Sequence, residues 1–92
     1  MSVARRLVIH GRVQGVFFRG WAVETARALG LCGWVRNRRD GTVEAVAQGE
    51  EQAVERFIAL ARNGPAAAKV ERIDVGEASS ATFSGFEQRA TL

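Results

Sequence analysis

The sequence has few of the residues from which disulfides and metal sites are built. Cys32 is the only cysteine and His10 the only histidine, so no disulfide can form within the chain and no Cys/His cluster can hold structural zinc. No cluster of acidic residues suited to Mg²⁺ occurs either, and the sequence predicts no metal and no cofactor. We therefore expect packing alone to stabilise the fold, in a reducing, cytoplasmic compartment.

Long apolar runs are also missing. The apolar run near the N-terminus, residues 7–9, is too short for a signal peptide, and no run approaches the length that spans a membrane. We expect no membrane partner. At 92 residues and 47% hydrophobic content, residues 1–92 are expected to form one domain around one core.

Lysine is nearly absent, because Lys69 is the only one and arginine supplies the remaining cations. With a net charge of +3, the chain should attract anions of any kind. Arginine suits bidentate recognition of phosphate or carboxylate. A biased genomic base composition is the alternative explanation, since alanine is also abundant.

Hydrophobic periodicity predicts alternating short strands and helices. The predicted strands cover residues 3–10, 32–38, 42–49 and 70–78, and the predicted helices cover 18–29 and 50–63. An Asp-Gly turn at 38–41 joins two of the strands. The order β-α-β-β-α-β is typical of a ferredoxin-like α+β sandwich, with two helices on one face of an antiparallel sheet and a possible short fifth strand in the tail.

The segment "GRVQGVFFRG", residues 11–20, joins the first strand to the first helix. A helix N-terminus presents free N–H groups and partial positive charge, and the glycines let a preceding loop curl into an anion-binding nest. Arg19 would lie at the opening of this nest, where its guanidinium can make two hydrogen bonds to the same anion. The backbone of this candidate site is formed by Gly11, Arg12, Val13, Gln14, Gly15, Val16, Phe17 and Phe18.

The loop alone leaves two interpretations open. It matches neither the P-loop nor the dinucleotide-binding glycine pattern, and its glycines also suit a turn that needs them only for backbone geometry. Asn37 is equally ambiguous. Strand alternation places it on the same face as Val35, where it can orient a ligand or a water, but an asparagine at a strand end can also simply form the turn.

Two motifs at matching separation resemble the acylphosphatase family. "IHGRVQGVFFR" (9–19) is similar to the first motif of that family and "GWVRNRRDGTVEAVAQG" (33–49) to the second. The resemblance departs at the C-terminus, where the family often reads F-E-I-R-Y and this chain has "FEQRA" from Phe86. That departure puts the packing of the last strand in question.

The resemblance implies a metal-independent hydrolase that cleaves the carboxyl–phosphate bond of small acyl phosphates. It assigns the phosphate to the loop after the first strand and to Arg19, and the placing of the attacking water to Asn37. Inorganic phosphate or sulfate should then compete with substrate. We expect a free-standing monomer.

Other features and functions have competing explanations. His10 is predicted to be a solvent-facing or turn-side residue instead of a general base, and Cys32 a small packing residue instead of a reactive thiol. Trp21 and Trp34 are predicted to cover the core or the sheet, and "RNRR" (36–39) to be a solvated hairpin tip. A nucleic-acid-binding module is disfavoured because the central strands carry no stacking aromatic. A ligand-binding domain without turnover and a module of a larger enzyme are the remaining alternatives.

Overall fold

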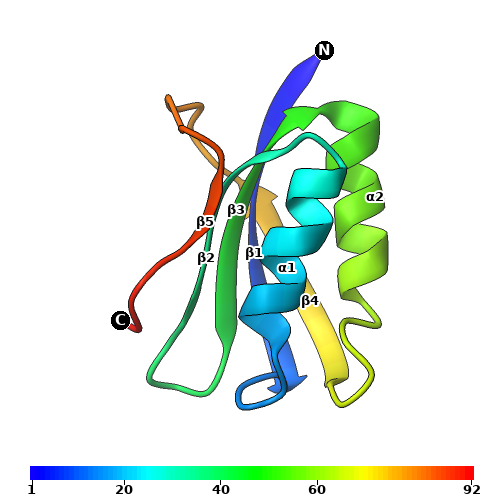
Figure 1. The fold of residues 1–92 in the computed structure, drawn as a ribbon, viewed down its shortest axis with the longest axis vertical. Coiled ribbons are helices and arrows are strands. Elements are labelled where there is room, and N and C mark those ends of the chain that lie inside the picture. The colour runs from blue at the N-terminus through cyan, green and yellow to red at the C-terminus, as the bar shows by residue number, and fades with distance from the viewer.

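The computed structural model describes residues 1–92 and contains every element that the sequence predicts, with boundaries within two residues of those expected (Figure 1). The strands are β1 (Ser2–Arg12), β2 (Cys32–Asn37), β3 (Val43–Glu50), β4 (Lys69–Glu77) and β5 (Phe86–Gln88). The helices are α1 (Phe18–Ala28) and α2 (Glu51–Ala61). The two helices pack on one face of a sheet of order β4-β1-β3-β2-β5, which is the predicted ferredoxin-like α+β arrangement (Figure 1).

The prediction of an antiparallel sheet is correct for the four main strands, and the possible fifth strand, whose direction was not predicted, is present and makes the sheet mixed. β1 pairs antiparallel with β3 and β4, and β2 pairs antiparallel with β3, but β5 runs parallel to β2. The reason is the path of residues 78–85. They cross from the β4 edge to the β2 edge at the end of the sheet where β2 begins, so β5 enters in the same direction as β2 (Figure 1).

Gly11 continues β1 instead of ending it. The strand passes through a bulge between His10 and Gly11 and stays paired with β4 as far as Arg12. Gly11 has a φ of 125°, and a Cβ there would collide with the carbonyl oxygen of Lys69. Only glycine fits this bulge. The predicted end of this strand at residue 10 is therefore two residues too early, and the loop to α1 begins at Val13.

Aromatic side chains join the two helices to the last strand. Trp21 lies against Phe18 and Phe57, with ring centroids 5.4 and 6.4 Å away, and Phe57 lies 5.8 Å from Phe86. Phe86 is 1% exposed and belongs to the same buried core as both helices. The atypical C-terminal sequence therefore does not prevent β5 from packing, and Phe86 fixes the position of β5 beside β2.

The opposite face of the sheet carries a buried carboxylate. The Glu44 side chain is 5% exposed and accepts hydrogen bonds from Arg6 Nε at 2.6 Å and Arg36 Nε at 2.8 Å. Burial opposes ionisation of this carboxyl, but the hydrogen bonds from Arg36 and Arg6 outweigh that effect and hold its pKa below the ordinary value of 4.5. The ionised form is therefore the form that the fold stabilises.

This network predicts a loss of stability in Glu44→Gln. The amide keeps the shape but loses two charge-assisted hydrogen bonds, and because Arg6 is half exposed we expect a loss of about 1–2 kcal/mol in unfolding free energy at pH 7. A folded pKa below 4.5 means that Glu44 stabilises the native state fully above pH 4.5 and loses this effect as the pH falls through the folded pKa. The gap between variant and wild type should therefore close in acid.

Thermal unfolding followed at pH 7 and at pH 3 checks both the loss of stability at neutral pH and its disappearance in acid. Glu55→Gln is the matched control, because Glu55 is exposed on α2 and makes no ion pair. Equal melting temperatures for wild type and Glu44→Gln at pH 7 would contradict the stabilising role.

Candidate active site

Residues 13–17 turn the chain sharply from β1 into α1. Gly15 has a φ of 73° and Phe17 a φ of 67°, and Phe17 is the only non-glycine residue with positive φ. A left-handed conformation costs an ordinary residue about 1–2 kcal/mol, and such strain gathers at functional sites. α1 begins directly after Phe17, without a side-chain cap and without an acidic residue in its first turn. The helix end is therefore open to an anion.

The backbone N–H groups of residues 15–20 have no acceptor within the protein. The first hydrogen bond that closes a turn of α1 comes from the N–H of Trp21, which donates to the carbonyl of Phe17 at 3.0 Å. Consecutive free N–H groups around left-handed residues form a concave anion site, and the helix dipole adds positive charge there. The backbone here therefore has the form that an anion-binding nest requires, and the binding of phosphate to it stays a prediction.

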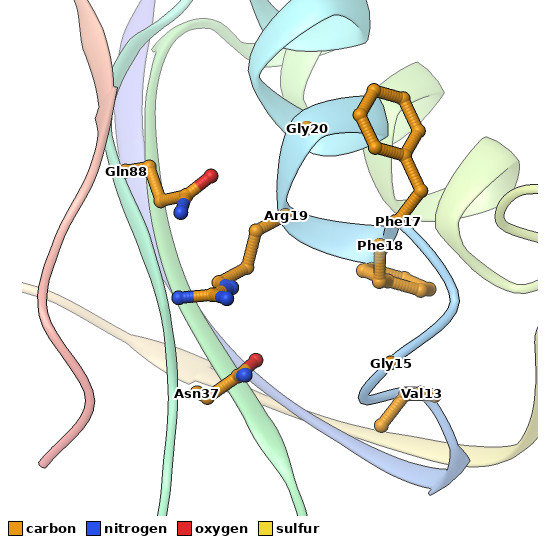
Figure 2. A pocket seen from close by; sticks show the side chains of 8 residues that line it. All are labelled: Val13, Gly15, Phe17, Phe18, Arg19, Gly20, Asn37 and Gln88. Carbon is orange, nitrogen blue, oxygen red and sulfur yellow. The ribbon is translucent and has the colours of Figure 1, made fainter.

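Most residues of this segment line a cavity of about 230 Å³ (Figure 2). Its lining residues are Val13, Gly15, Phe17, Phe18, Arg19, Gly20, Asn37 and Gln88. The structure therefore brings Arg19 of α1 and Asn37 of β2 together with four of the predicted loop residues. Four others do not line the cavity: Gly11 and Arg12 are strand residues paired with β4, while Gln14 and Val16 face elsewhere.

Three polar side chains enter the cavity, and none of them has a partner in the protein. No side-chain hydrogen bond or ion pair is made by Arg19, Asn37 or Gln88. By contrast, Arg6 and Arg36 both donate hydrogen bonds to Glu44. Figure 2 shows the Arg19 guanidinium between the amides of Asn37 and Gln88. An unpaired guanidinium beside free N–H groups attracts a phosphate-sized anion.

Gln14 holds the loop against the strand that carries Asn37. Its Nε2 donates to the carbonyl oxygens of Arg38 at 2.7 Å and of Thr42 at 2.9 Å, at the two ends of the β2–β3 turn. The side chain of Gln14 is therefore occupied in joining the loop to the hairpin. No sequence pattern predicts these two hydrogen bonds, because the partners of Gln14 lie 24 and 28 residues further along the chain.

Two residues that line the cavity, Gly20 and Gln88, were not among the site residues predicted from the sequence. Gly20 allows the ring of the exposed Phe17 to lie against α1, since a Cβ at Gly20 would collide with that ring. Gln88 belongs to β5. The sequence could have indicated its position, because residues two apart on a strand share a face and the apolar Phe86 marks the face that packs on the core.

The remaining candidate residues lie outside the cavity. The His10 ring lies 2.9 Å from Asp74 on the sheet, and Cys32 borders a second cavity beside Arg27. Trp34 lies under the guanidinium groups of Arg36 and Arg89, 4.7 and 5.0 Å from the ring centroid. No three His, Cys, Asp or Glu side chains gather as metal ligands. Neither helix is long and apolar enough to cross a membrane.

Comparisons with known proteins identify the family to which the chain belongs. The family model described as acylphosphatase matches residues 5–88. An acylphosphatase of Acidovorax sp. (strain JS42) is 55% identical over 91 residues, which cover 99% of this chain and 94% of the relative. The solved acylphosphatase of Coxiella burnetii has a TM-score of 0.92 at 34% identity, over 96% of this chain and 93% of that one. The solved acylphosphatase of Bacillus subtilis has a TM-score of 0.90 at 39% identity, over 97% and 99%.

Sequence and fold therefore match over nearly the whole length, and the chain belongs to the acylphosphatase family, which supports hydrolysis of a small acyl phosphate.

Proposed function

We propose that this chain hydrolyses the carboxyl–phosphate bond of acyl phosphates to a carboxylate and inorganic phosphate by placing water, without a covalent intermediate. The observation that carries the proposal is the cavity in which the unpaired Arg19 lies beside the free N–H groups of residues 15–20, with Asn37 next to them. None of the lining side chains is a nucleophile or an ionisable acid or base other than arginine.

Hydrolysis of an acyl phosphate requires neither a protein nucleophile nor an ionisable acid or base in the cavity. In the proposed complex the loop N–H groups and the Arg19 fork hold the phosphoryl oxygens, and the Asn37 amide orients a water toward the phosphorus. The water oxygen bonds to phosphorus while the bond from phosphorus to the acyl oxygen breaks, and its electron pair leaves with the carboxylate. One water hydrogen stays on the new phosphate oxygen, and the other passes to a second phosphate oxygen or to solvent. Because carboxylates are stable anions at neutral pH, the leaving group needs no proton.

We also propose that the reaction is independent of metal. The phosphoryl group passes through a loose transition state, so catalysis consists mainly of positioning and of stabilising charge on the phosphoryl oxygens. Arg19 and the loop N–H groups supply that positive charge from one side of the cavity. The same contacts suit inorganic phosphate and sulfate, which should compete with substrate. One core shared by both helices and all five strands supports residues 1–92 acting as one domain.

Release of phosphate from benzoyl phosphate by the purified protein tests the proposal. Turnover should be unaffected by excess EDTA, measured beside the spontaneous hydrolysis rate. No turnover above the spontaneous rate would refute the hydrolase. Activity that disappears with EDTA and returns with Mg²⁺ would instead refute the metal-independent mechanism alone.

A further inference from the structure

Gln88 reaches the active site from the last strand. Residues 86 and 88 of β5 share a face, and since Phe86 is buried in the core, Gln88 lies on the same helix side of the sheet. The parallel pairing sets Gln88 beside Val35 of β2, and Asn37 lies two residues further along on that same face. From strand spacings, the Cα atoms of Gln88 and Asn37 are about 8 Å apart.

The amide of Gln88 is free to bind a ligand. It lines the cavity, it is exposed, and it makes no hydrogen bond to the protein, whereas Gln14 and Gln48 both bind backbone groups. An amide can donate and accept hydrogen bonds at once. An aliphatic side chain at this position could do neither.

In-line geometry indicates which part of the substrate Gln88 meets. The attacking and leaving oxygens lie on opposite sides of the phosphorus. If Asn37 holds the water and Arg19 the phosphoryl group, the acyl group leaves on the side away from Asn37. Figure 2 shows Gln88 on that side, across the Arg19 guanidinium from Asn37.

We propose that Gln88 is a specificity-determining residue that hydrogen-bonds the acyl group and favours small acyl phosphates carrying an amino or hydroxyl donor next to the carbonyl. The inference rests on the proposed function. The cavity of about 230 Å³ is smaller than the roughly 300–1,000 Å³ common for ligand pockets, so it suits a short acyl group. Gln88 accepts the hydrogen of the acyl donor, which a methyl group in the same place cannot provide.

Carbamoyl phosphate and acetyl phosphate test this directly, since they are similar in size and differ in an amino group against a methyl group. A neutral hydrogen bond corresponds to a factor of about 2–12, so Gln88→Leu should lower the ratio of kcat/KM for carbamoyl phosphate over acetyl phosphate about fivefold. Inhibition by inorganic phosphate should stay at the wild-type level. Gln52→Leu, at an exposed glutamine of α2 outside the cavity, should leave the ratio unchanged.

Gln88→Ile, a second apolar variant with a β-branched side chain that suits a strand, should reproduce the leucine result and guards against a folding defect specific to leucine. An unchanged ratio in both variants would overturn the proposal. So would an equal loss on both substrates together with weaker phosphate inhibition, because that would place Gln88 in the phosphate site. If the wild type hydrolyses neither substrate, the proposed function itself has failed.

Discussion

Replacing Arg19 with alanine should lower kcat/KM for benzoyl phosphate by on the order of 10²-fold or more while the fold stays intact. A hydrogen bond to a charged group contributes about 1.5–3 kcal/mol, and the guanidinium can make two of them to the phosphoryl oxygens. The charge on those oxygens is what the site must stabilise in the transition state. The fold should be unaffected, because the Arg19 side chain makes no hydrogen bond or ion pair within the protein.

The shape of the arginine matters in addition to its charge. Arg19→Lys should recover little activity, since an ammonium group cannot reproduce the planar fork. Competition by phosphate or sulfate should weaken in both variants. Arg56→Ala is the matched control, at an exposed arginine of α2 that makes no ion pair and does not line the cavity. A lysine variant with nearly native rates would show that net charge is all that this position supplies.

Asn37→Ala should lower kcat by about 10²-fold or more while KM changes little. If the amide places the attacking water, its loss misplaces a reacting group, and such errors cost rates on that scale. Substrate binding should persist, because Arg19 and the loop N–H groups keep their contacts with phosphate. Turnover of benzoyl phosphate, together with calorimetric binding of inorganic phosphate, separates these two effects.

Asn37→Asp examines the same role by a different chemistry. A carboxylate can still accept a hydrogen bond from water, but it repels phosphate, so both the rate and the phosphate affinity should fall. If Asn37→Ala loses phosphate affinity in proportion to its rate, the residue binds phosphate instead of placing water. If that variant keeps full activity, Asn37 is only a turn-forming asparagine.

The sequence determined the order of elements and the positions of the two motifs. Periodic apolar residues such as Val54 and Phe57 on one helix, and the alternation along β2, predict local structure because each strand or helix buries one face. The same alternation placed Asn37 on the face of Val35, and that face is the one on which the cavity lies. Local patterns were sufficient here because the face of a residue depends only on its neighbours along the chain.

Only the tertiary structure decided how separate segments meet. The parallel pairing of β5 depends on the path of residues 78–85 across the sheet, the bulge at Gly11 depends on the backbone of β4, and the hydrogen bonds of Gln14 depend on a hairpin more than 20 residues away. Gln88 enters the cavity because Phe86 anchors β5 in the core beside β2. Contacts between distant residues leave no period in the sequence, since they arise from packing of completed elements, and so the final shape of the site follows from the fold.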